Sequence, residues 1–128
     1  MSEWNWLSDD VAEAVHDEQL AEHGGGGGIR DPGALLSALA RPQNLAANAD
    51  PDAADLAAAY AFGVSKDHPF IDGNKRTAWV LARLFLVING AQLNYGPADA
   101  VLVMLGLAAG ELSEQEFATW FRERVSSS

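Results

Sequence analysis

The chain has 128 residues, a formal net charge of -10 and no cysteine, and 48% of its residues are hydrophobic. This length and apolar content predict one domain, residues 1–128, with its own core. The acidic charge argues against direct binding to nucleic acid or to anionic membranes, because such binding relies on Lys and Arg. Disulfides and cysteine-based zinc sites are excluded. No basic and apolar signal segment precedes Trp4, which predicts a cytoplasmic location.

The first predicted helix follows the capping signal of Ser8, after which two acidic residues occupy the first turn. We expect it to lie on the surface and to end near His23, before the glycines. His16 and His23 fall on one face of this helix, but a metal site would need a third ligand, and none is nearby in the sequence. The two histidines are therefore interpreted as exposed residues without a role.

The pentaglycine Gly24–Gly28 is the strongest break in the chain. A glycine-rich phosphate cradle would need a strand before it and a helix beginning with Lys-Ser or Lys-Thr after it. Neither is present in the sequence. The segment is therefore interpreted as a flexible connection.

A short helix is predicted next, since Asp31 supplies a cap and Pro32 suits the first helical turn. It should run to about Ala40 and end at Arg41-Pro42, with three leucines facing inward: Leu35, Leu36 and Leu39. The polar segment 42–50 would then form a surface loop.

Asp50-Pro51 repeats this start signal and predicts a helix that runs to about Lys66. Its apolar positions keep the spacing of one helical face: Leu56, Ala59, Tyr60, Gly63 and Val64. Because several of these residues are small, the helix should pack closely against its neighbours.

The stretch 75–88 contains one charged residue beyond its first turn, Arg83. A helix here would be apolar on nearly every side, so the rest of the domain must bury it. It is shorter than the about 20 apolar residues that a membrane span needs. We therefore expect the central helix of the fold here, ended by Asn89-Gly90 in a left-handed cap.

The remaining chain predicts two more helices and no convincing strand. One helix begins at Pro97 and ends before Gly110. The last begins with a capping box of Ser113 and Glu116 and turns three aromatic residues toward the core: Phe117, Trp120 and Phe121. A frayed tail, 126–128, follows. The predicted fold class is all-α, with six helices that include a buried central one.

Polar residues are concentrated immediately before the central helix, where the chain reads SKDHPFIDGNKR. The first turn of a helix has unpartnered N–H groups and the positive end of the dipole, so it favours an anion such as phosphate. Gly73 lets the backbone approach such a ligand, and Asn74 can bind local amides or phosphate oxygens. Lys75 and Arg76 are unfavourable at this helix end unless an anion is present, which indicates function.

Two further residues of this stretch suit phosphate chemistry, and a third has a structural role. Asp72 offers hard oxygens to Mg²⁺, an ion that is often held by one carboxylate together with substrate phosphates. His68, when neutral, can take a proton from a hydroxyl nucleophile. Phe70 is interpreted as an apolar anchor that holds the loop against the core.

The nine residues 68–76, HPFIDGNKR, resemble the signature loop of the Fic/Doc superfamily, H-x-F-x-[DE]-[GA]-N-[GK]-R, at every position. The likeness extends to the glycine segment and the helix start after it, to the alanine-rich stretch before the motif, and to the Asn-Gly after the central helix. It therefore covers most of the chain. The resemblance implies the helical Fic fold, ATP and Mg²⁺ as cofactors, and a flap within 42–50 that orders a target peptide.

The form of the motif distinguishes two branches of this superfamily. The Lys form resembles the Doc (death-on-curing) branch, which transfers the terminal phosphate of ATP, whereas the Fic branch transfers AMP. Fic proteins usually have Gly at the position of Lys75 and a second Arg at the position of Trp79. Both departures favour phosphoryl transfer. AMP transfer is kept as the alternative, and a catalytically inactive antitoxin-binding module is a third hypothesis.

By resemblance, the protein is a toxin of a toxin-antitoxin system that phosphorylates a Ser or Thr hydroxyl of a protein target. The best-known target of the family is a threonine of elongation factor Tu, so inhibition of translation and growth is expected. The implied catalytic residues are His68, Lys75 and Arg76, the implied metal ligand is Asp72, and the implied phosphate-binding residues are Gly73, Asn74, Lys75 and Arg76.

The resemblance also implies a partner. Fic proteins restrained in cis carry an inhibitory helix of the pattern [ST]-x-x-x-E-[GN], but no Glu in this chain is followed by Gly or Asn. Restraint must then come from a separate antitoxin of the Phd type. Its disordered tail would fold as a helix in an apolar groove near the motif.

Overall fold

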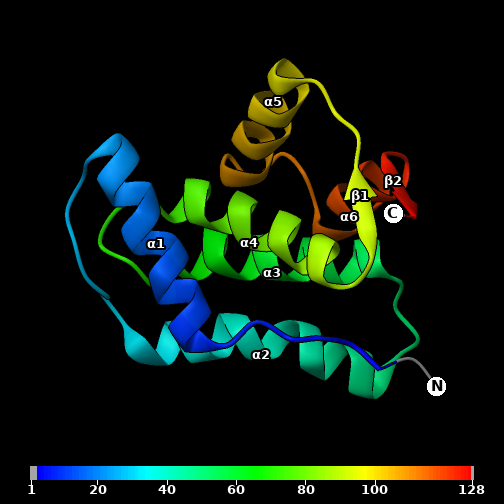
Figure 1. Ribbon diagram of the computed structural model, residues 1–128, viewed down its shortest axis with the longest axis horizontal. Coiled ribbons are helices and arrows are strands. Elements are labelled where there is room, and N and C mark those ends of the chain that lie inside the picture. Colours follow the sequence, from blue (N-terminus) through cyan, green and yellow to red (C-terminus); the bar gives the residue numbers. More distant parts are fainter. Residues whose placement is uncertain (1–2, 128) are drawn as a thin grey trace.

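The computed structural model describes residues 3–127, and in this range it confirms the all-α prediction with six helices (Figure 1). In chain order the elements are α1 (Asp9–His23), α2 (Pro32–Asn48), α3 (Ala53–Asp67), α4 (Asn74–Ile88), β1 (Ala91–Leu93), α5 (Pro97–Ala108), α6 (Glu114–Arg122) and β2 (Val125–Ser127). Helices α3 and α4 pack together at the centre, with α2 on one side and α5 on the other, and α1 crosses one end (Figure 1).

Local capping begins three of the six described helices at the residue that the sequence predicted. A first-turn backbone N–H donates to the side chain of each of three N-cap residues: Ser8, Asp31 and Ser113. The start of α3 is a correction, because its N-cap is Asp52 and not Asp50. Asp52 accepts from the Asp55 N–H at 2.8 Å, and the Asp55 carboxylate accepts from the Asp52 N–H at 3.0 Å. This reciprocal box satisfies two N–H groups and so determines the helix start.

Helix α3 has more buried residues than any other described helix. All five positions predicted for its inner face are buried, which confirms that prediction. Its small residues let α2 approach closely: a Cβ added to Gly63 would lie 3.2 Å from the Ala38 Cα atom. A larger side chain at Gly63 would therefore separate α2 from α3.

Helix α4 is central, but it is buried on one face only, and not on every side as predicted. Its inward face includes Phe85, on which the rings of Trp4 and Trp6 pack at centroid distances of 5.9 Å each. Its outward face carries Arg83 and the 65% exposed Val87. The small number of charged residues in this helix thus led to a prediction of too much burial, since isolated apolar side chains are common on protein surfaces.

Helix α2 is longer than predicted. The prolyl residue at 42 was expected to end it near Ala40, but the helix continues to Asn48 with Pro42 buried inside it. Pro42 removes one backbone hydrogen bond, and burial of its apolar ring offsets part of that loss. Most of the segment 42–50 is thus helix, where a loop and a flap were expected. Leu36, which was predicted to face inward, is 58% exposed.

The two strands were not predicted. They pair in antiparallel fashion, Ala91 with Ser127, Gln92 with Ser126, and Leu93 with Val125. The tail that was expected to fray is thus partly a strand, and Ser128 lies outside the described residues. Strands of three residues contain too few positions for an alternating pattern to stand out. The predicted left-handed cap of α4 falls on Gly90 (φ 79) alone, because Asn89 has φ -107.

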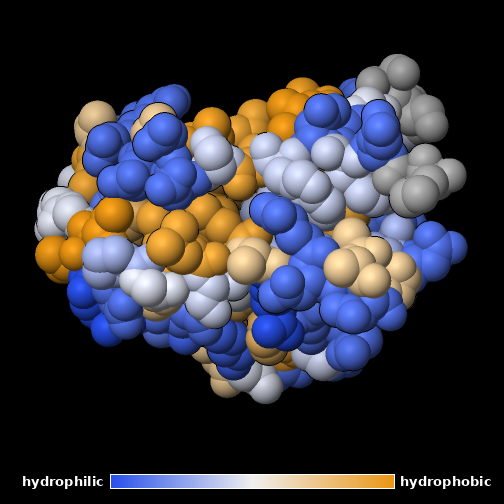
Figure 2. Space-filling model, turned by 90° about the horizontal axis from the view of Figure 1, so that it is seen from below, coloured by the Kyte–Doolittle hydropathy of each residue, from blue (hydrophilic) through white to orange (hydrophobic). Residues whose placement is uncertain are grey.

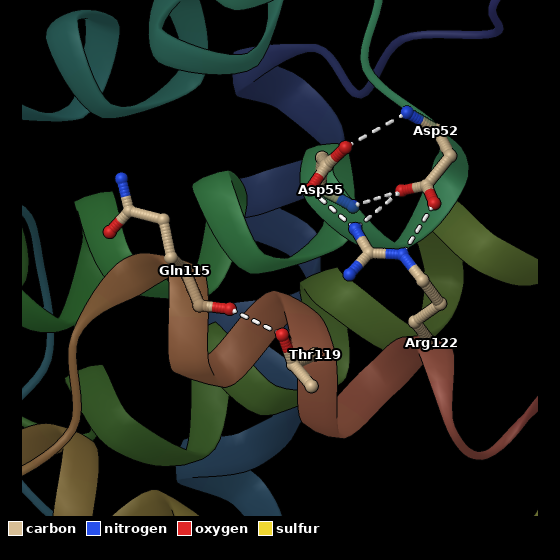
Figure 3. A network of polar contacts seen from close by, with 5 residues as sticks. All are labelled: Asp52, Asp55, Gln115, Thr119 and Arg122. Carbon is tan, nitrogen blue, oxygen red and sulfur yellow. Dashed lines mark hydrogen bonds and ion pairs between the residues drawn. The ribbon is translucent and has the colours of Figure 1, made fainter.

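An ion-pair network joins the start of α3 to the end of α6 (Figure 3). Arg122 donates from Nε to Asp52 at 2.7 Å and from Nη2 to Asp55 at 2.7 Å. The hydrogen-bonded guanidinium lowers the pKa of Asp52 to about 2, against the desolvation that would raise it. Nearby in α6, Thr119 donates its hydroxyl to the Gln115 carbonyl at 3.0 Å. The network links two helices that are distant in the sequence.

The face on which α2 lies is mostly hydrophilic, with apolar side chains gathered in its left half (Figure 2). This distribution agrees with the acidic composition of the chain. Among residues 3–127, no helix combines the length and the apolar character that crossing a membrane requires.

Candidate active site

The candidate site is built on the motif loop, residues 68–73, which connects α3 to α4. Both ends of this loop are in the left-handed conformation: His68 (φ 48) ends α3, and Gly73 (φ 76) precedes α4. Among the described residues, His68 is the only non-glycine residue with positive φ. This conformation is sterically costly for a residue with a Cβ, so other contacts must hold it.

Asn74 closes the motif loop from its C-terminal end. Its side chain accepts from the Phe70 N–H at 3.0 Å and donates to the Phe70 carbonyl at 2.9 Å. The Phe70 ring is 1% exposed and belongs to the hydrophobic core. Both the backbone and the side chain of Phe70 are thus fixed, while His68, Ile71 and Asp72 of the same loop are exposed.

A pocket of about 410 Å³ lies over this loop, a size within the usual range for small-ligand sites. It is lined by all the site residues predicted from the sequence except Phe70: His68, Asp72, Gly73, Asn74, Lys75 and Arg76. Four of these carry titratable or charged side chains, and all four are exposed. Ser65 of α3, Ile71 of the loop and Ala108 of α5 complete the lining.

The N-terminus of α4 opens into this pocket without a side-chain cap. Its N-cap is Gly73, which has no side chain to accept from the first-turn N–H groups. Lys75 and Arg76 lie in that same turn. Free N–H groups, the helix dipole and two cations therefore favour a bound anion, and phosphate matches this chemistry.

Asp72 lines the pocket, and its carboxylate oxygens suit a hard cation. Its Oδ1 accepts from the Gly73 N–H at 2.8 Å. Beside Oδ2 lies Gly25, where an added Cβ would come within 2.6 Å of that oxygen. Because Gly25 has no side chain, there is room beside it for the Asp72 carboxylate. A single carboxylate is enough for a Mg²⁺ ion whose other ligands are phosphates and water.

The glycine segment 24–28 was predicted to be a flexible connection. The structure differs, because the segment packs along the motif loop. Gly28 accepts from the Ile71 N–H at 3.2 Å, and the Pro69 carbonyl accepts from the N–H groups of Arg30 and Asp31 at 2.8 and 3.1 Å. An isolated bridge pairs Ile29 with Phe70. These long-range backbone contacts leave no local sequence signal, since glycine is equally typical of mobile linkers.

Two residues of this region had no predicted role. Arg30 donates to the carbonyls of His68 and Asp67 at 2.6 and 2.8 Å, where a cation also suits the C-terminal end of α3. His16, interpreted as exposed, is buried, and its Nε2 lies 2.7 Å from the Asp72 carbonyl oxygen. The available sequence signal for His16 was its place four residues after the apolar Ala12, on the same helical face.

A second, apolar hollow of about 230 Å³ adjoins the pocket, because both are lined by Lys75 and Arg76. Its other walls come from α4 and α5: Trp79, Ala100, Val101, Met104 and Leu105. Val101 and Leu105 are 59% and 52% exposed. We refer to this hollow as the α4–α5 groove.

Comparisons with known proteins agree with the motif. The model of the Fic/DOC family matches residues 6–86, which is more than half of the chain. The chain is 34% identical over 122 residues to "Protein kinase doc" of Escherichia phage P1, and the match covers 94% of this chain and 96% of that protein. It is 48% identical over 67 residues to "Toxin Doc" of Mycolicibacterium smegmatis, a match that covers 51% of this chain and 52% of the relative.

The resemblance drawn from the signature loop is thereby confirmed, with two relatives that both bear the name Doc. The family match includes the motif loop and all seven residues that were predicted for the site. The chain belongs to the Fic/Doc family.

Proposed function

We propose that this protein transfers the terminal phosphate of ATP to a Ser or Thr hydroxyl of a protein target. One observation carries the proposal: a histidine, a carboxylate and two cations line a single pocket at the open N-terminus of α4. This is the set that phosphoryl transfer needs, since its catalysis consists mainly of positioning and of charge stabilisation. The relative named protein kinase doc, aligned over nearly its whole length, supports the same reaction.

His68 is proposed as the general base. It is exposed in the pocket, and its backbone is held by the α3 cap hydrogen bond to the Val64 carbonyl and by Arg30. A neutral imidazole can accept the proton of the attacking hydroxyl as the oxygen bonds to phosphorus. With its backbone held in this way, His68 presents its imidazole from a fixed position in the pocket wall.

The first turn of α4 is proposed to bind the phosphates. Backbone N–H groups after Gly73, with the charges of Lys75 and Arg76, would neutralise the transferring phosphoryl group and the leaving diphosphate. Asp72 would hold Mg²⁺, which supplies charge neutralisation at the phosphates. The Asn74 side chain is engaged with Phe70, so its proposed role is to hold the loop in shape.

Two residues favour phosphoryl transfer over AMP transfer. The side chain of Lys75 forms part of the pocket wall, and a glycine at this position would leave that space empty. Trp79, in place of a second Arg, packs among aromatic rings: Tyr95, Trp120 and Phe121. Position 79 therefore supplies no cation for the far end of a triphosphate.

We further propose that the protein acts as a toxin, with elongation factor Tu as the candidate target, and that a Phd-type antitoxin restrains it. The relative named Toxin Doc supports this assignment. The α4–α5 groove suits an antitoxin helix, because its floor is apolar and Lys75 and Arg76 at its edge favour acidic flanking residues. A helix in this groove would lie next to the pocket and obstruct the target.

Labelled ATP tests the reaction. The protein is incubated with elongation factor Tu and Mg²⁺, and with ATP labelled either on the terminal phosphate or on adenine. Terminal label on the target is expected. Adenine label on the target would contradict the proposal and show AMP transfer. If no protein in a translation extract took up either label, the result would favour a module that only binds its antitoxin.

A further inference from the structure

His16 is a buried titratable residue that the proposed reaction does not use. Its side chain comes from the middle of α1, and the residue is 2% exposed. The Nε2 atom lies 2.7 Å from the Asp72 carbonyl oxygen. Because a carbonyl oxygen can only accept, Nε2 must carry the proton and donate to it. His16 thus makes a direct polar contact with the backbone of the proposed metal ligand, from 56 residues away in the sequence.

The His16 ring also fixes the other side of the motif loop. It stacks on Phe70 with ring centroids 3.9 Å apart and an angle of 7° between the planes. One imidazole therefore contacts both the anchor of the loop and the residue that carries the carboxylate. A purely apolar residue at this place would fill the space but would leave the Asp72 carbonyl without this donor.

The carboxylate of Asp72 is restricted from a second direction. Gly25, with φ +121, lies so close that an added Cβ would be 2.6 Å from Oδ2 and 3.2 Å from Cγ of Asp72. On the other side, the Gly73 N–H donates to Oδ1 at 2.8 Å. The side chain of Asp72 is thus confined between the glycine segment and the start of α4, while His16 holds its backbone.

We propose that His16 is a positioning residue that sets Asp72 for magnesium-dependent nucleotide binding, and that Gly25 forms the wall against which the carboxylate rests. The proposal rests on the proposed function in one respect, namely that Asp72 holds Mg²⁺. Partners that orient a metal ligand commonly change metal affinity by roughly 10- to 100-fold when they are removed. A similar loss is expected here.

A pair of His16 variants separates the hydrogen bond from packing. His16→Phe keeps an aromatic ring against Phe70 but has no donor, whereas His16→Gln retains an N–H near the position of Nε2. The Mg²⁺ concentration that half-saturates binding of a non-hydrolysable ATP analogue is measured by calorimetry. We expect an increase of roughly 10-fold or more for His16→Phe and recovery of most of that loss in His16→Gln. Equal affinity in wild type and His16→Phe would overturn the proposal.

The glycine wall has its own matched comparison. Gly25→Ala places a methyl group against Asp72 at a positive φ, whereas Gly24 also has a positive φ (+77) but an added Cβ there would meet nothing within 4 Å. Gly25→Ala should weaken Mg²⁺-dependent binding to a similar extent, and Gly24→Ala, which carries the same kind of backbone strain, should leave it within about 2-fold of wild type. Equal losses in both variants would show a general effect on the segment and would contradict a specific role of Gly25.

Hydrogen exchange distinguishes failure of this proposal from failure of the proposed function. Exchange of the backbone amides at Ile71 and Gly73 is expected to be faster in His16→Phe than in wild type or His16→Gln, with or without ligand. Unchanged exchange would refute positioning by His16, even in an active kinase. If wild type bound no Mg²⁺-nucleotide but exchange responded as expected, the proposed function would fail while His16 would still hold the loop. The claim about magnesium would then fail with the function.

Discussion

Arg30 and His68 are joined by a hydrogen bond of 2.6 Å from the guanidinium Nε to the backbone carbonyl, and Nη2 of the same Arg30 reaches the Asp67 carbonyl at 2.8 Å. One side chain thus satisfies two carbonyls at the end of α3, immediately beside the strained backbone of His68. Arg30, two residues after the glycine segment, thereby stabilises the backbone conformation of His68, which lines the pocket.

Arg30→Ala should lower the free energy of unfolding by about 1 kcal/mol, because two carbonyls lose a charged donor, although the site is exposed to water. Arg30→Lys should recover less than half of this, since an ammonium group keeps the charge but lacks the planar fork that spans both carbonyls. Urea denaturation measures both variants. Equal stability of wild type and Arg30→Ala would show that these contacts contribute nothing to the fold.

His68→Ala should reduce phosphoryl transfer about 10²- to 10⁴-fold, the usual effect of losing a general base. His68→Gly should be equally inactive but more stable than His68→Ala by about 1 kcal/mol, because glycine adopts positive φ without the steric cost of a Cβ. Steady-state kinetics and thermal unfolding test the two parts. Undiminished transfer by either variant would remove His68 from the mechanism.

Asn74→Ala should destabilise the protein by about 1 to 3 kcal/mol, since the partly buried N–H and carbonyl of Phe70 lose their partners together. Asn74→Asp should be intermediate, because a carboxylate can accept from the N–H but cannot donate to the carbonyl. Chemical denaturation gives the stability, and nucleotide binding reports the loop. If Asn74→Ala unfolded like wild type but bound no nucleotide, the side chain would have to contact ligand directly.

Acid should remove the contribution of the Asp52–Arg122 pair (Figure 3). The pKa of Asp52 is lowered to about 2 in the folded state from an ordinary 3.8. Its contribution is thus fully present above about pH 4 and is lost as the pH falls toward 2, because the unfolded state binds the proton first. Since the pair is about half exposed, the effect should be below about 1 kcal/mol. Asp52→Asn should flatten this part of the curve of unfolding free energy against pH.

Substitutions in the α4–α5 groove should release the proposed antitoxin. Val101→Asp and Leu105→Glu place charge on an apolar floor and should weaken the complex at least 10-fold, while phosphoryl transfer by the free protein persists. Leu36→Glu is the matched control, because Leu36 is equally exposed but lies on α2. Growth rescue by the co-expressed antitoxin provides the measurement. Rescue of all three variants would place the antitoxin elsewhere.

Several features followed from the sequence alone because they depend on contacts between near neighbours. The caps at Ser8 and Ser113 are hydrogen bonds to residues three positions ahead, so the pattern of residues is enough to predict them. Gly73, for which the sequence predicted backbone freedom, has a positive φ of 76 in the structure. The nine-residue motif likewise places all its polar groups on one loop and one helical turn, which is why its members share a pocket.

Other features were decided only by tertiary structure, since each depends on a residue far away in the chain. His16 is buried because the motif loop lies against α1, and the glycine segment lies along the same loop, whose Ile71 N–H donates to the Gly28 carbonyl. Pro42 stays within a helix because the packing around it offsets the lost bond. Strand β1 forms because β2 returns to pair with it. In each case the deciding free energy comes from long-range burial or pairing, which no local pattern of residues encodes.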